Sequence, residues 1–122
     1  MSESARPTFS VAVVGSLPPC DSQPEEARAA ERLAVFLDRV TARAREAHDL
    51  ALVTFTHGIG APWARSRGHS MILIPRFDGH AVADREMIEF AGAVVVVGER
   101  ARWARLIRLA TEAGKPVRFY NG

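Results

Sequence analysis

The segment that most constrains the fold is a run of four valines between Ala93 and Gly98. A run without a polar face is typical of a strand that is buried on both sides of a sheet. Residues 9–15 form a second run of this kind, which also ends in glycine. Stretches with helical spacing of apolar residues separate such runs along the chain. This alternation predicts parallel strands, because parallel neighbours need long crossover connections.

We expect five strands that alternate with four helices. The predicted strands cover residues 9–15, 50–56, 70–75, 93–98 and 117–120, and the predicted helices cover 25–47, 63–67, 80–90 and 100–113. Right-handed crossovers would place helices on both faces of the sheet. The predicted fold class is therefore α/β: a Rossmann-like three-layer sandwich with a five-stranded, mainly parallel sheet. Residues 1–8 are predicted as a flexible N-terminal tail and residues 9–122 as a single Rossmann-like domain.

Composition narrows the class of protein. The 122 residues carry a formal net charge of +2, and 48% of them are hydrophobic, which suits one globular domain. The single cysteine, Cys20, cannot form an internal disulfide, and this favours a reducing compartment. No run approaches the roughly 20 apolar residues that a membrane helix needs. We therefore expect a cytoplasmic protein without a membrane partner. Four arginines between residues 100 and 108 are interpreted as a solvated helix face, and nucleic acid as the less favoured partner.

The candidate site follows from the predicted sheet. In open parallel sheets, ligands bind outside the carboxyl ends of the strands, where helix N-termini present unpaired N–H groups. Glycine at a strand end lets a ligand approach the backbone. We expect amide donors to be free along this rim. The predicted ligand-binding residues are Gly15, Ser16, His57, Gly58, Gly60, Arg85 and Gly98.

Two glycine turns each allow two interpretations. The turn from His57 to Gly60 could hold a phosphate or ribose, with His57 as a donor, or could be a tight strand-to-helix turn. Ser16, which follows Gly15, could donate its hydroxyl and amide to a phosphate or merely cap its turn. Binding is the slightly favoured interpretation for both.

The chemically reactive side chains are also ambiguous. Arg85 could pair with a phosphate, or with Glu89 four residues later. Glu99 is the candidate catalytic carboxylate, with a solvated acid at a helix N-terminus as the favoured alternative. Cys20 could be a nucleophile, but no base is tied to it, so an unreactive thiol is favoured. The histidines lack metal-ligand spacing, so we expect no metal, and nothing in the sequence calls for a cofactor.

Several short motifs resemble the SLOG superfamily, and above all its small stand-alone bacterial and phage members. They are spread over residues 11–117: Gly15-Ser16, His57-Gly58-x-Gly60, Trp63-Ala64 with Gly68, Gly79 with Ala81, Arg85 and Met87, Gly98, and Ala110 with Gly114 and Pro116-Val117. The resemblance implies a Rossmann-like domain that binds a nucleotide or a nucleotide-derived ligand. Residues 98–103 lack the glycine-rich motif of the phosphoribohydrolase branch, so the resemblance implies binding rather than hydrolysis.

Two alternative functions stay open. Residues 84–97 and 113–120 resemble the end of nucleoside deoxyribosyltransferase-like proteins, which implies an enzyme that hydrolyses or transfers an N-glycosidic bond, through Glu99 or less favourably Asp84. The other alternative is a ligand-free subunit that assembles through the surfaces of Trp63 or Trp103. A nucleotide-like small molecule and a second copy of the chain, in a homo-oligomer, are the expected partners.

Overall fold

The computed structural model describes residues 6–55, 58–75 and 80–121. Its centre is a five-stranded sheet in the order β3-β2-β1-β4-β5, and every pair of neighbouring strands is parallel. The strands are β1 (Thr8–Gly15), β2 (Asp49–Phe55), β3 (Ser70–Ile74), β4 (Ala93–Val97) and β5 (Val117–Tyr120). This architecture confirms the predicted α/β, Rossmann-like sandwich. The strand order reverses between β1 and β4, which are neighbours in the sheet.

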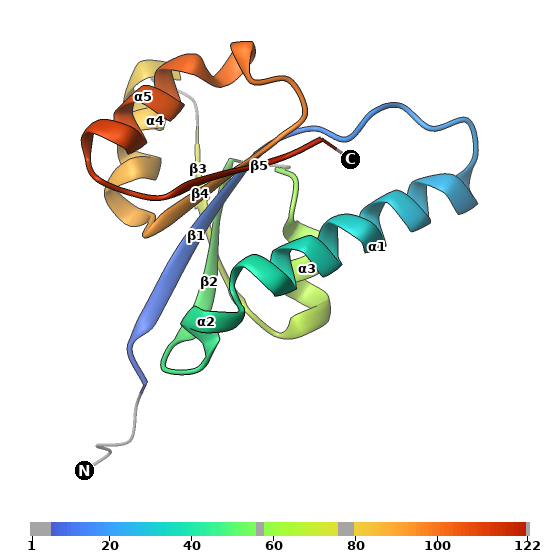
Figure 1. The fold of residues 1–122 in the computed structure, drawn as a ribbon, viewed down its shortest axis with the longest axis horizontal. Coiled ribbons are helices and arrows are strands. Elements are labelled where there is room, and N and C mark those ends of the chain that lie inside the picture. The colour runs from blue at the N-terminus through green and yellow to red at the C-terminus, as the bar shows by residue number, and fades with distance from the viewer. Residues whose placement is uncertain (1–5, 56–57, 76–79, 122) are drawn as a thin grey trace.

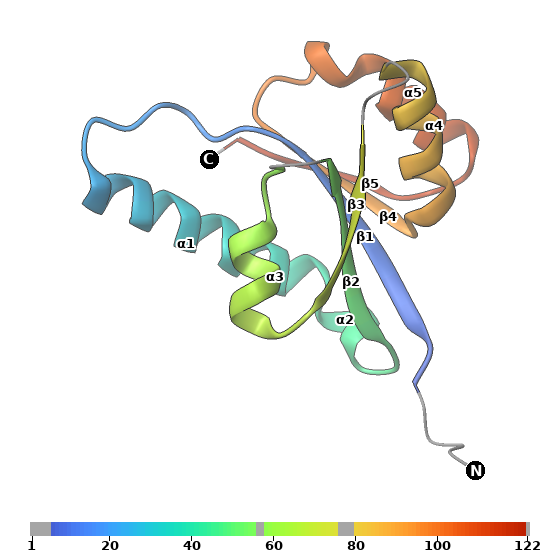
Figure 2. The ribbon, with the colours of Figure 1, turned by 180° about the vertical axis from the view of Figure 1, so that it is seen from behind.

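Helices cover both faces of this sheet (Figures 1 and 2). One face carries the first three helices, and the other carries the last two. They are α1 (Gln23–Val40), α2 (Ala42–Arg45), α3 (Ala61–Arg67), α4 (His80–Phe90) and α5 (Ala104–Glu112), the last preceded by a 3₁₀ turn, η1 (Ala101–Trp103). None of the helices in the described ranges is long and apolar enough to cross a bilayer.

Successive side chains of the central strands point alternately into two hydrophobic cores, one on each face of the sheet. Val11 and Val13 of β1 pack with α1 and α3, whereas Ala12 and Val14 pack with α4 and α5. All four side chains are buried. A strand with a core on each face has few places for polar side chains, and this explains the nearly continuous aliphatic runs in the sequence.

The predicted helix over residues 25–47 is wrong as one piece, because the chain leaves the helix at Thr41. Ser22 caps the start of α1 by accepting a hydrogen bond from the amide of Glu25 at 3.3 Å. Thr41 is buried, and its hydroxyl donates to the carbonyl of Leu37 at 2.6 Å. A threonine hydroxyl that bonds back to the preceding turn competes with the helical backbone and favours a bend. The short α2 then follows in a new direction.

The two tryptophans have different surroundings. Trp63 is only 3% exposed, so it cannot offer the assembly surface that the sequence left open as an alternative. Trp103 is partly buried and stacks on Phe55, with ring centroids 6.0 Å apart. Both therefore contribute to packing within the chain.

Candidate functional site

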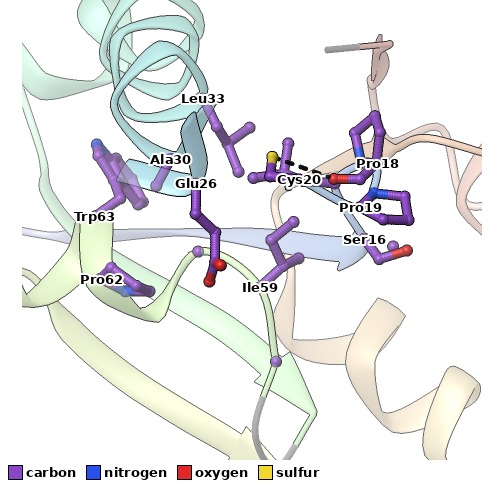
Figure 3. Close-up of a pocket in the computed structure, with 14 residues that line it drawn as sticks. Ser16, Pro18, Pro19, Cys20, Glu26, Ala30, Leu33, Ile59, Pro62 and Trp63 are labelled. Carbon is purple, nitrogen blue, oxygen red and sulfur yellow. Dashed lines mark hydrogen bonds between the residues drawn. The ribbon is translucent and has the colours of Figure 1, made fainter. Parts of the chain in front are cut away.

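A cavity of about 630 Å³ opens at the carboxyl ends of β1 and β2, between α1 and the start of α3 (Figure 3). We call it the carboxyl-edge cavity. Residues from the β1–α1 loop, from α1 and from the β2–α3 turn line it: Gly15, Ser16, Leu17, Pro18, Pro19, Cys20, Glu26, Ala30, Leu33, Gly58, Ile59, Gly60, Pro62 and Trp63. A volume of this size is in the usual range for small-molecule sites.

Local sequence shapes the walls of this cavity. Pro18 and Pro19 fix the backbone dihedrals of the β1–α1 loop, which passes over the cavity before Ser22 starts α1. The thiol of Cys20 turns back to the carbonyl of Pro18, with the sulfur 3.7 Å from the oxygen. On the opposite wall, Gly60 is the N-cap of α3 with a φ of +93°, a conformation that glycine adopts without strain.

The cavity is mostly apolar and has one charged group. Among the described residues that line it, Glu26 supplies the only carboxylate, and there is no lysine or arginine. Figure 3 shows this carboxylate extending from α1 toward the space between Ile59 and Pro62. The hydroxyl of Ser16 and the thiol of Cys20 are the other polar side-chain groups of the lining, apart from the Trp63 indole. An ionised carboxylate only accepts hydrogen bonds, so this site suits a ligand with donor groups on an apolar body.

The predicted site residues divide into two groups. Gly15, Ser16, Gly58 and Gly60 line the carboxyl-edge cavity. Other predicted residues lie elsewhere: Arg85 lines a hollow between α4 and α5, on the other face of the sheet, while Gly98 and the exposed Glu99 follow β4 and do not line the cavity. His57 lies outside the described residues. The structure thus places the two glycine turns after β1 and β2 at one cavity, but not Arg85, Gly98 or Glu99.

The expectation of free amides along the rim is wrong for three of the predicted residues. The amide of Ser16 donates to the carbonyl of Val97 at 3.2 Å, and that of Gly98 donates to Tyr120 at 2.8 Å. The amide of Gly58 donates to Phe55 at 2.7 Å. These contacts continue the sheet, or close a turn, just beyond the strand ends. Such bonds satisfy these three amides, which are therefore not available to a ligand.

The glycines at the carboxyl ends of β1 and β4, Gly15 and Gly98, allow close contacts between these strand ends. Gly15 has a φ of +109°, and a Cβ atom there would lie 1.9 Å from the carbonyl oxygen of Val97. Gly98 has a φ of +83°, and its Cβ would lie 2.7 Å from the carbonyl oxygen of Ser16. The absence of a side chain therefore lets two backbones touch. Gly58 differs, because the nearest atom to its Cβ would be a side-chain atom, the Thr54 hydroxyl oxygen, at 1.7 Å.

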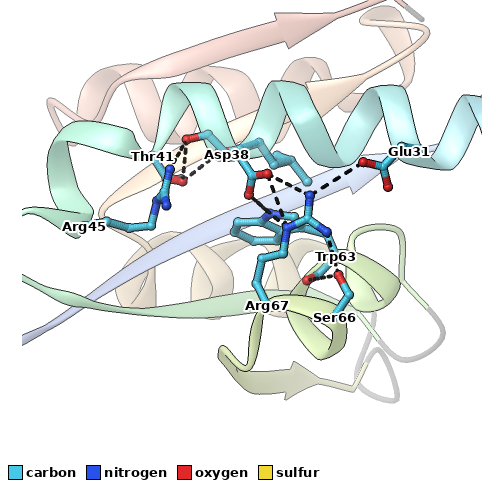
Figure 4. Close-up of polar contacts among 8 residues, drawn as sticks. Glu31, Asp38, Thr41, Arg45, Trp63, Ser66 and Arg67 are labelled. Atoms are coloured by element: carbon cyan, nitrogen blue, oxygen red, sulfur yellow. Dashed lines mark hydrogen bonds and ion pairs between the residues drawn. The ribbon is translucent and has the colours of Figure 1, made fainter.

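A polar clamp outside the cavity joins its two helical walls (Figure 4). Asp38 of α1 accepts a 2.8 Å hydrogen bond from the Trp63 indole, and its carboxylate binds Arg67 at 2.7 Å. The hydrogen bonds from Arg67 hold the pKa of Asp38 below its ordinary value, although partial burial opposes this effect. Because Trp63 also lines the cavity, the clamp fixes one wall relative to the other.

Several lining residues were not predicted as site residues from the sequence. Glu26 had a sufficient explanation as an acid near the positive end of α1, and Pro18 and Pro19 had one as loop residues. Their position in the site depends on how the loop after β1 returns across the sheet edge, and no local pattern encodes that path. The only available signal was the length of a proline-containing loop directly after a glycine-terminated strand.

Within the described ranges, no three His, Cys, Asp or Glu side chains gather as a metal ion would require. No known protein family, no curated protein and no solved structure matches this chain.

Proposed function

We propose that this chain binds a nucleotide or nucleotide-derived small molecule, with the nucleoside portion inside the carboxyl-edge cavity. One observation carries the proposal: an apolar cavity of about 630 Å³ at the carboxyl ends of parallel strands, with a single carboxylate in its described lining. This edge is where sheets of this class hold their ligands. The resemblance to the SLOG superfamily agrees with the proposal, and membership of that superfamily stays a prediction.

Different lining residues suit different parts of a nucleotide. Pro18, Pro19 and Ile59 offer apolar surface to the face of a base, and Glu26 offers acceptor oxygens to ribose hydroxyls or to an amino group. A phosphate would find no cation in the described lining. We therefore expect affinity to depend on the nucleoside portion and to change little with the number of phosphates.

Cys20 gives a direct test, because it is the chain's single cysteine and it lines the cavity. The rate at which iodoacetamide alkylates Cys20 is measured with and without adenosine, the other nucleosides, AMP and ADP-ribose. A bound ligand should slow alkylation in proportion to its occupancy. Glu26→Gln should weaken the protecting ligand about tenfold, the effect of one charged hydrogen bond.

Glu46→Gln is the matched control, because it removes an exposed carboxylate that follows α2 and does not line the cavity, so it should leave protection unchanged. If no compound of the series alters the alkylation rate at millimolar concentration, the proposal is wrong. Equal weakening by Glu26→Gln and Glu46→Gln would also contradict it, because the carboxylate in the cavity would then have no specific role.

A second candidate function is the cleavage or transfer of an N-glycosidic bond. Glu26 favours it, since this carboxylate lies in the cavity while Glu99 does not. Incubation with nucleosides and nucleotides, followed by chromatography of the released base, tests the idea. Base release that is lost in Glu26→Gln and kept in Glu99→Gln would establish catalysis at this site. Identical blank traces from the wild type and both variants would leave binding alone.

A further inference from the structure

A second hollow lies at the opposite edge of the sheet, where the strands begin. It encloses about 560 Å³ beside the first residues of β2 and β3 and the C-terminal end of α3. We call it the amino-edge cavity. Its charged and titratable lining residues are Arg6, Arg45, His48, Asp49, Arg67 and His69. Three guanidinium groups thus face one carboxylate around this space, the reverse of the charge found in the carboxyl-edge cavity.

The three arginines differ in how far their charge is neutralised. Arg67 is paired with the Asp38 carboxylate at 2.7 Å. Arg45 donates instead to the backbone carbonyl of Asp38 at 2.7 Å. Its charge also helps to lower the pKa of the Asp38 carboxylate, but that carboxylate is already paired with Arg67. Arg6 likewise donates to backbone carbonyls, those of Arg45 and His48.

Asp49 compensates this charge only weakly. Its carboxylate lies 3.9 Å from Nε of Arg6, and its side chain is 67% exposed, so water screens the pair. A guanidinium has five N–H donors, and these contacts occupy only some of them. Among residues 6–55, 58–75 and 80–121, the contacts of Arg6 and Arg45 leave some of their N–H donors unused, so both side chains bring positive charge and donors to the same hollow.

His69 supports this interpretation from the inner side of the cavity. Its ring packs edge-on against Trp63, with centroids 4.8 Å apart, and its Nε2 atom is buried without a hydrogen-bond partner in the described part of the chain. Burial, followed by the charge of Arg45, lowers the pKa of this imidazole, and Arg67 adds to the effect while Asp38 opposes it. The surroundings of His69 thus carry a net positive field.

We propose that the amino-edge cavity binds a phosphate group, either inorganic phosphate or a phosphate monoester, through Arg6 and Arg45. Guanidinium matches the geometry of phosphate oxygens and forms paired hydrogen bonds with them. The dianion would balance the charge that Asp49 leaves uncompensated. The site lies at the other edge of the sheet from the carboxyl-edge cavity, so it does not depend on nucleotide binding there.

Calorimetric titration of the whole chain at pH 8 tests the proposal, with inorganic phosphate, ribose 5-phosphate and sodium chloride of equal ionic strength as probes. Arg6→Gln/Arg45→Gln should weaken phosphate at least about tenfold, since it removes two charged donors. Arg108→Gln is the matched control, because it removes an exposed charge on α5 and should change the affinity less than about twofold. Equal affinity for the two phosphates would identify the phosphate group alone as the ligand, and tighter binding of ribose 5-phosphate would identify a monoester.

Asp49→Asn supplies a gain of affinity that loss of folding cannot imitate. Removal of the one carboxylate should strengthen phosphate binding about threefold, the effect of a weak exposed ion pair. The proposal is wrong if the wild type shows no phosphate heat beyond that of chloride, if Arg108→Gln weakens binding as much as the double variant, or if Asp49→Asn leaves the affinity unchanged.

Discussion

The carboxyl end of β1 lies between β2 and β4, and its contacts with these two strands differ. Toward β4, Gly15 and Gly98 bring the backbones into direct contact, and the amide of Ser16 donates to Val97. Toward β2, the carboxyl-edge cavity lies between Ser16 and Ile59. The first side is closed by backbone, and the second is open and bounded by side chains.

This difference separates two uses of glycine at a strand end. On the closed side, the positive φ and the close carbonyl oxygen exclude any other residue. On the open side, Gly60 is the N-cap of α3, and its φ of +93° favours glycine, while a Cβ atom there would lie 3.4 Å from side-chain atoms of Leu52 and Val13 rather than against backbone. Glycine at a strand end is therefore no evidence of a ligand unless the space beside it is empty.

Gly15→Ala tests the closed side and should have the largest effect on stability. A Cβ atom 1.9 Å from a carbonyl oxygen forces β1 and β4 apart at a position that also has a positive φ. We expect the free energy of unfolding to fall by more than about 3 kcal/mol, as for the severest steric substitutions. Urea denaturation followed by circular dichroism measures the loss.

Gly68→Ala is the control for this experiment. Gly68 also has a positive φ, of +74°, but a Cβ atom there would meet no atom of the described chain within 4 Å. Only the dihedral cost of about 1 kcal/mol applies there. Equal losses from the two substitutions would show that backbone conformation alone, and not the contact between strand ends, accounts for the glycine after β1.

On the closed side, the sequence predicted the strands and the glycines at their ends, but not the contact between these glycines. The valine run and the run before Gly15 predicted central parallel strands correctly, because burial on both faces leaves a local, continuous pattern. Gly15 and Gly98 were rightly placed at the carboxyl ends of strands, but their contact depends on the register between β1 and β4. Register across a crossover is a long-range property that no local pattern contains.

The open side was less predictable for a related reason. Glu26 enters the cavity from α1, and its role depends on the path of the preceding loop.

The break at Thr41 was missed because apolar residues continue at helical spacing to Ala44 and Ala47, while a single buried hydroxyl ends the helix. Helical periodicity reports which face is apolar, and it does not report whether the axis continues in one direction.

The clamp between α1 and α3 gives the second test, since it holds the walls of the open side. Asp38→Ala should lower the free energy of unfolding by about 1–2 kcal/mol, because it removes charged hydrogen bonds from a partly exposed site. Arg67→Ala and the double variant complete a double-mutant cycle. A coupling free energy below about 0.3 kcal/mol would contradict the clamp.

Amide hydrogen exchange in the same variants distinguishes the open side from the closed side. Loss of the clamp removes the hydrogen bond of the Trp63 indole to Asp38 and removes none of the backbone contacts between the ends of β1 and β4. Amide hydrogen exchange should therefore accelerate in α3 and stay unchanged in β1 and β4. Acceleration of all three elements together would show that the two sides unfold as one unit.

His69, which lines the amino-edge cavity at the other edge of the sheet, gives a smaller, pH-dependent effect. Its pKa in the folded chain lies below the ordinary value, so the unfolded chain takes up a proton first as the pH falls. Stability should be complete above about pH 6.5 and decline as the pH falls below this value toward the lower, folded pKa. Thermal unfolding of the wild type and His69→Gln, compared from pH 7.5 to 5.5, measures the difference. The melting temperature of the wild type should fall more steeply than that of the variant, and parallel curves would refute this role for His69.

Glu26→Gln should have the smallest effect on stability, because Glu26 is exposed and its charge contributes only through the dipole of α1. We expect a change within about 0.5 kcal/mol by urea denaturation, as for other exposed acids near a helix start. The same substitution is expected to weaken the ligand that protects Cys20. Gly98, a closed-side residue that does not line the cavity, should behave in the opposite way: its substitution should cost stability without contacting the ligand. If Glu26→Gln instead destabilised the fold by several kcal/mol, its carboxylate would be structural, and the open side would lose the one charged group that makes it a specific site.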